Sequence, residues 1–149
     1  MNSFSENNKI VRVSNAAAAA TTDITSSAVD MTGFNSCTFL VPFGTITTGA
    51  ITSVKVQQSS DDGVSDGYSD LEGTSVTVAD DDDNKIAQIE VVKPAKRYLK
   101  CIVDRGTQNA VVDGIIAVLS NSDSGPVSTH STIITAGREI HETPDEGTA

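Results

Sequence analysis

The segment from Cys37 to Gly44, which reads CTFLVPFG, decides the expected fold. Every second residue in it is apolar and of core type, and the run ends at a glycine. Successive side chains of a β-strand point to opposite faces, so this spacing predicts a strand with one buried face. The residues expected on that face are Cys37, Phe39, Val41 and Phe43.

Similar period-two patterning recurs on both sides of this segment. It covers residues 9–13, 51–56, 76–78, 86–91, 98–103 and 111–119. Acidic, turn-forming stretches at 61–67 and 80–84 separate some of these runs and predict hairpin loops. No segment keeps a 3.6-residue period over three turns, which excludes a parallel α/β fold with crossover helices. The sequence therefore predicts an all-β protein, an antiparallel β-sandwich or jelly roll of seven to eight strands with a polar C-terminal arm.

The two ends of the chain differ in composition from this middle part. Five consecutive alanines, Ala16–Ala20, lack amphipathic flanks, and an apolar loop or strand is preferred over a helical turn. We expect an N-terminal strand and linker over residues 1–22, a sandwich core over 23–120 and a flexible arm over 121–149. The arm holds few apolar residues, and three of them are candidate partner-binding residues: Ile133, Ile134 and Ile140.

The charge balance indicates which classes of partner the chain can bind. The 149 residues include 20 acidic and 10 basic side chains, a net charge of −10, which disfavours a nucleic-acid partner. Five of the basic residues gather between Lys93 and Arg105, and we expect them to pair with the many carboxylates. No apolar run reaches the roughly 18 residues of a membrane span, so no membrane partner is expected. The first residues lack a signal-peptide pattern, so we expect a protein that is made and used in the cytosol, or assembled there into a structure that later leaves.

Candidate chemistry is sparse. Cys37 and Cys101 lie in strand-like runs and are expected to be buried free thiols, with a disulfide or metal site as the alternative. The loop at 61–67 resembles a calcium loop, but Val64 stands where an oxygen ligand belongs; a solvated hairpin is preferred over an irregular calcium site. His130 and His141 both lie in the arm, where nothing holds a base beside a nucleophile. We expect no enzymatic activity, no cofactor and no metal site.

Five segments, in order, carry a resemblance to a known family: residues 39–47, 54–63, 70–73, 96–99 and 103–110. Together they resemble small structural proteins of tailed-bacteriophage virions, of the capsid decoration (cement) type. The resemblance covers roughly residues 9 to 119 and implies a protein on the capsid exterior that stabilises the shell by bridging major capsid protein subunits. It also implies a homotrimer, assembled in the host cytoplasm and located in the virion.

Two other functions stay open at this point. One is a different virion role: head-to-tail joining, a tail accessory or fibre anchoring. The other is a β module that binds carbohydrate or a host surface. Such a module would need exposed aromatic side chains on a groove, and the sequence offers only Tyr68, Tyr98 and four phenylalanines.

Overall fold

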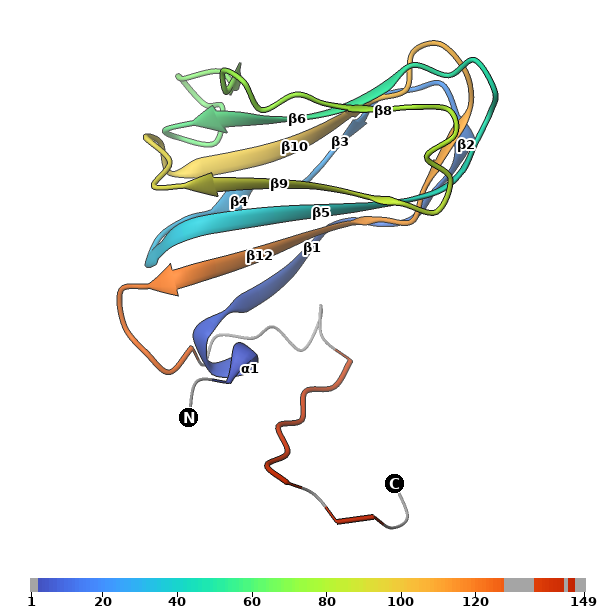
Figure 1. Ribbon diagram of the computed structural model, residues 1–149. Helices are drawn as coiled ribbons and strands as arrows, with labels where there is room; N and C mark the ends of the chain where they lie inside the picture. The colour runs from blue at the N-terminus through green and yellow to red at the C-terminus, as the bar shows by residue number, and fades with distance from the viewer. Residues whose placement is uncertain (1–2, 128–135, 144, 147–149) are drawn as a thin grey trace.

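The computed structural model describes residues 3–127, 136–143 and 145–146, which form two antiparallel β-sheets around one hydrophobic core (Figure 1). The first sheet has the order β1-β12-β5-β11-β2, and β9 also pairs with β5. Its strands are β1 (Lys9–Ser14), β12 (Ile115–Ser122), β5 (Phe34–Ile46), β11 (Ala110–Val112), β2 (Ala17–Ala20) and β9 (Ile86–Val92).

The second sheet has the order β3-β10-β6-β7, with β4 paired to β10 and β8 paired to β6. Its strands are β3 (Ile24–Thr25), β10 (Tyr98–Asp104), β6 (Thr52–Ser59), β7 (Ser69–Asp70), β4 (Val29–Asp30) and β8 (Val76–Val78). The all-β, antiparallel sandwich prediction is confirmed. The described residues contain twelve strands rather than seven or eight, partly because three two-residue strands, β3, β4 and β7, carry too little pattern to be predicted.

The core confirms the period-two interpretation of β5. Phe39 and Val41 are fully buried, and Phe43 is 2% exposed. Facing them from the second sheet are fully buried residues of β6 and β10: Val54, Val56, Leu99, Cys101 and Val103. Burying one such apolar side chain contributes roughly 1.5–3 kcal/mol, so these two inner faces hold the sheets together.

Two connections differ from the sequence prediction. The loop at 80–84 was expected to be a hairpin, but it joins β8 in the second sheet to β9 in the first. Its carboxylates bind the end of β5 and the loop after it: Asp83 Oδ1 accepts from the amide of Ile46, the last residue of β5, at 2.5 Å, and Asp80 Oδ2 accepts from that of Gly49 at 2.6 Å. These bonds let the acidic loop close one end of the sandwich.

The apolar run 111–119 was expected to be one strand, but it is broken between β11 and β12. Gly114 has φ +121, a conformation that side chains disfavour, and a Cβ there would lie 3.1 Å from the carbonyl oxygen of Ser14. β11 and β12 both lie on the side of β5 opposite β9: the amide of Asp113 donates to the carbonyl of Pro42 at 2.9 Å, whereas the amide of Phe43 donates to the carbonyl of Lys85, just before β9, at 2.9 Å.

The ends of the chain take part in the fold. The alanine run forms β2, which confirms the extended interpretation, and both β1 and β2 belong to the first sheet. β12 continues to Ser122. Val127 is only 6% exposed, and its amide donates to the carbonyl of Glu6, in the short helix α1 (Phe4–Asn7), at 2.7 Å. Ile133 and Ile134 lie outside the described residues, and Ile140 is 46% exposed.

Arg105 ties β2 to the sandwich. The residue is 3% exposed, and its guanidinium donates to the carbonyl oxygens of Thr22 at 2.8 Å, Ala18 at 2.9 Å and Ala110 at 2.7 Å. Burial lowers the pKa of Arg105, but a guanidinium stays charged at every accessible pH. Charge-assisted bonds to three carbonyls compensate for the lost hydration of this group.

Both cysteines are free and fully buried, as predicted. Burial raises the pKa of each thiol to about 12. In the described part of the chain, no helix is long and apolar enough to cross a membrane.

Replacing Arg105 by alanine is expected to destabilise the protein by about 3 kcal/mol, because one buried and two partly buried carbonyl groups lose a charged donor. Urea unfolding of Arg105→Ala would measure this, with the exposed Arg12→Ala as the control for loss of one positive charge. The free energy of unfolding of Arg105→Lys should lie between those of Arg105→Ala and Arg12→Ala, since one ammonium group reaches fewer carbonyl oxygens than a guanidinium. Equal stability of Arg105→Ala and Arg12→Ala would contradict the assigned role.

The raised pKa of the thiols predicts that neither Cys37 nor Cys101 reacts with iodoacetamide in the folded protein at pH 8, since the thiolate is the reactive form. Mass spectrometry should find no label until denaturant is added, and then two labels. Rapid labelling of the native protein would show that the strands bearing the cysteines open readily.

Candidate ligand-binding site

The helix α1 is short but well capped. Ser3 is its N-cap: Ser3 Oγ accepts from the amide of Glu6 at 3.3 Å and donates to Glu6 Oε2 at 2.8 Å. The Ser3 hydroxyl thus caps one of the amides that a helix start otherwise leaves unpaired, and its bond to the Glu6 carboxylate holds it in place. It fixes the positions of Phe4, Asn7 and Asn8.

The pairing of β1 with β12 brings this helix to the far end of the chain. Lys9 is in register with Leu119, so α1, just before Lys9, lies beside Ser120, Asn121 and Ser122 at the end of β12. Asn121 has φ +53, a left-handed conformation that asparagine tolerates. Figure 1 shows α1 below the arrowhead of β12.

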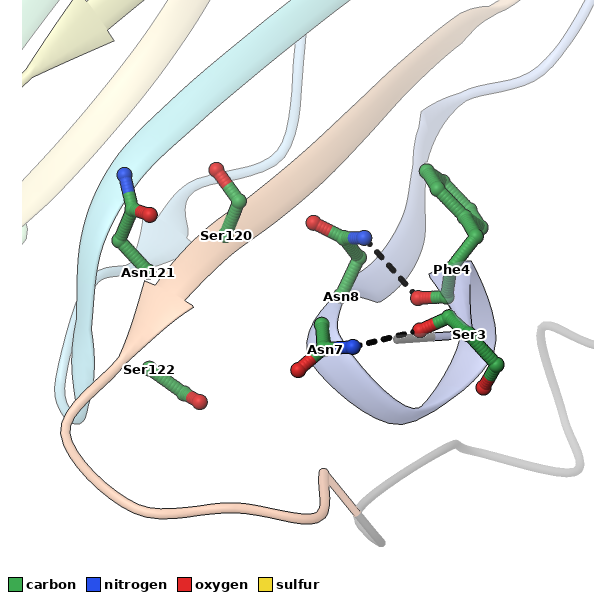
Figure 2. Close-up of a pocket in the computed structure, with 7 residues that line it drawn as sticks. All are labelled: Ser3, Phe4, Asn7, Asn8, Ser120, Asn121 and Ser122. Carbon is green, nitrogen blue, oxygen red and sulfur yellow. Dashed lines mark hydrogen bonds between the residues drawn. The ribbon is translucent and has the colours of Figure 1, made fainter. Parts of the chain in front are cut away.

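A pocket of about 490 Å³ lies between these two segments. It is lined by Ser3, Phe4, Asn7, Asn8, Ser120, Asn121 and Ser122 (Figure 2). In Figure 2 the side-chain oxygens of Asn8 and Ser122 are directed into the space between α1 and β12. The volume is within the roughly 300–1,000 Å³ typical of small-molecule sites.

Several polar groups of this pocket can form hydrogen bonds with a ligand. Asn8 Nδ2 donates to the carbonyl of Phe4 at 2.9 Å, which orients its side-chain oxygen as a remaining acceptor. Among the described residues, the side chains of Ser120, Asn121 and Ser122 have no hydrogen-bond partner in the structure. Hydroxyl and carboxamide groups both donate and accept, so this wall suits a ligand that is itself rich in such groups.

Phe4 adds an apolar surface at the rim of the pocket. It is 56% exposed, whereas Phe39 and Phe43 are buried in the core. The rings of Tyr68 and Tyr98 are already covered by cations: Lys100 Nζ lies 4.1 Å from the Tyr68 centroid, and Arg97 Cζ lies 5.0 Å from that of Tyr98. Phe4 is the aromatic residue best placed for a ligand.

The acidic loop at 61–67 closes the β6–β7 hairpin, as predicted. The carboxylate of Asp61 accepts from the amides of Val64 at 3.0 Å, Ser65 at 2.8 Å and Asp66 at 3.1 Å, and these bonds lower its pKa. Tyr68 Oη donates to Asp62 Oδ1 at 2.6 Å. The carboxylates therefore serve the fold of the loop itself.

The basic segment is paired largely as expected. Lys96 lies 2.7 Å from Asp66 and Arg97 Nη2 2.7 Å from Asp30, while Lys100 is 3.9 Å from Asp62. The bond from Lys96, together with those from Ser60, lowers the pKa of Asp66 to about 2. Arg105 departs from the prediction, because it binds carbonyl oxygens inside the fold.

The pocket residues were missed at the sequence level. The pattern Ser3-Phe4-Ser5-Glu6 is a capping-box signature and could have predicted the helix. The other wall gave no signal, since Ser120, Asn121 and Ser122 look like the start of a polar tail. Their proximity to α1 follows from the pairing of β1 with β12, which no local pattern specifies.

Comparisons with known proteins give one structural neighbour to report. No protein-family model and no curated protein matches the chain. A solved structure of the CBM22-1 xylan-binding domain from Paenibacillus barcinonensis Xyn10C is similar, with a TM-score of 0.42 and 10% identity. The match covers 80% of this chain and 92% of that domain.

This comparison corrects the predicted function. The neighbour is titled a xylan-binding domain and gives no support to a protein that stabilises the exterior of a phage capsid, so that predicted function is not retained. The similarity is too low to assign a ligand to this chain. The homotrimer stays a prediction.

The Asp61 carboxylate of the acidic loop already accepts hydrogen bonds from backbone amides. We therefore expect calcium chelation to leave the melting temperature of the protein unchanged. Thermal unfolding with excess EDTA and with millimolar calcium is the measurement. A fall of several degrees in EDTA would show that the loop holds a metal ion.

Proposed function

We propose that this protein is a non-enzymatic carbohydrate-binding module whose site is the pocket between α1 and the end of β12. The observation that carries the proposal is the composition of that pocket: hydroxyl and carboxamide side chains line it, and the exposed Phe4 stands among them. A β-sandwich serves as the rigid scaffold for this site.

The chemistry of the lining matches that of a sugar. Each sugar hydroxyl is both a donor and an acceptor, as are the side chains of Ser120, Asn121 and Ser122. A pyranose ring also presents C–H groups on its faces, and these are the apolar surfaces that an aromatic ring such as Phe4 can cover. Polar groups would set the orientation of the sugar, and removal of apolar surface from water would add affinity.

The same lining supports binding without catalysis. The seven residues are serine, asparagine and phenylalanine, and none of these side chains titrates near neutral pH. General acid–base chemistry requires a group that exchanges a proton at the working pH, within hydrogen-bond reach of the reacting atom. The pocket can hold a sugar but offers it no proton donor or acceptor of that kind.

Replacing Phe4 by alanine is expected to weaken binding of a neutral oligosaccharide about tenfold, which corresponds to about 1.4 kcal/mol. The ligand would be chosen by screening the full chain against immobilised neutral glycans, and affinity measured by isothermal titration calorimetry. Phe4→Trp should retain binding, because it keeps an aromatic face at the rim.

Val64→Ala is the matched control, since Val64 is also an exposed apolar residue, 83% accessible, in the acidic loop. It should bind as the unmodified protein does. Equal affinities of Phe4→Ala and Val64→Ala for the selected glycan would contradict the assignment of the site. Failure of the unmodified chain to bind any neutral glycan would contradict the proposed function itself.

A further inference from the structure

A second hollow lies at the same end of the sandwich as the candidate site. Its volume is about 450 Å³, and it is formed by residues 31–35, which lead into β5, and 93–97, which follow β9. The lining includes three cationic side chains, Lys93, Lys96 and Arg97, together with Thr32 and Asn35. In a chain with a net charge of −10, this is an unusual concentration of positive charge.

The two hollows are neighbours through the start of β5. Asn35 lines the second hollow, and its Nδ2 donates at 3.0 Å to the carbonyl of Asn121, which lines the first. Ser122 is in register with Phe34, and the amide of Lys93 donates to the carbonyl of Asn35 at 2.7 Å. Two strand spacings, roughly 10 Å, thus separate the backbone of Ser122 from that of Lys93.

The positive charges are not equivalent. Lys96 is paired with Asp66 at 2.7 Å, and Arg97 holds Asp30 through Nε at 2.9 Å and Nη2 at 2.7 Å. Lys93 has no carboxylate partner among the described residues, and its φ of +49 fixes an uncommon backbone conformation at the mouth of the hollow. Lys93 therefore carries the uncompensated charge.

One carboxylate lies on the opposite side. Asp123 Oδ1 accepts from Asn35 Nδ2 at 2.7 Å, which places a negative charge at the boundary between the two hollows. An anionic group would be repelled there and attracted toward Lys93. The charges thus favour a ligand that is neutral in the first hollow and negative in the second.

We propose that the hollow beside Lys93 holds an anionic substituent, a carboxylate or a sulfate ester, of a glycan whose neutral unit occupies the pocket between α1 and β12. This inference rests on the proposed function and narrows its ligand class to acidic glycans. Lys93 provides the charge contact, and Asn35 and Thr32 provide polar groups beside it.

The test compares matched neutral and acidic oligosaccharides, the acidic ones bearing either a uronic acid or a sulfate ester. Binding to the full chain is measured by calorimetry at low and at high salt. The acidic ligand should bind about three- to fivefold more tightly at low salt, and high salt should remove the difference, because a partly exposed charge contact is screened.

Lys93→Asn should abolish the preference and leave neutral binding intact, since asparagine tolerates the positive φ of this position. Lys85→Asn is the matched control: it removes the same charge at an exposed lysine paired with Asp82, and it should keep the preference. Asp123→Asn should increase the preference. Melting temperatures of all variants would establish that they are folded.

The binding results distinguish failure of the anionic subsite from failure of the proposed function. If the neutral ligand binds but neither acidic ligand binds more tightly, or if Lys93→Asn keeps the preference, the anionic subsite is overturned and the proposed function stands. If neither neutral nor acidic glycans bind the unmodified chain, the proposed function is overturned together with the subsite.

Discussion

The pairing of β5 with three other strands is the constraint on which the rest of the structure depends. β5 is thirteen residues long and is hydrogen-bonded to β12 on one side and β9 on the other, with β11 continuing beside its last residues. Its alternate side chains are fully buried against β6 and β10. A slip of one residue in this register would turn Phe39 and Val41 outward, so the whole first sheet is fixed by this strand.

Much of the acidity of the chain serves the fold. Asp61 closes the β6–β7 hairpin, and Asp83 and Asp80 bind amides at the end of β5 and in the loop after it. Asp30 and Asp66 neutralise two of the cations between Lys93 and Arg105. Of the three cations that line the second hollow, Lys96 and Arg97 are thus paired, and Lys93 has no carboxylate partner among the described residues.

The candidate site is assembled from two segments more than a hundred residues apart in the sequence. The capped helix α1 supplies Phe4, with Asn8 as its C-cap residue, and the end of β12 supplies Ser120, Asn121 and Ser122. Neither segment alone forms a concave surface. The antiparallel register of β1 against β12 places them beside each other and so creates the pocket.

The sequence by itself determined the fold class and the buried faces, because the alternation of side chains in β5, β6 and β10 is a local property of an extended chain. It also determined that the cysteines are buried thiols and that most of the basic cluster is paired. Only the tertiary structure decided that the loop at 80–84 crosses between sheets, that Gly114 breaks the last apolar run and that Arg105 is buried among carbonyl oxygens. It alone decided that Phe4 and Ser122 line the same pocket. Strand order and long-range register depend on packing between distant segments rather than on local pattern.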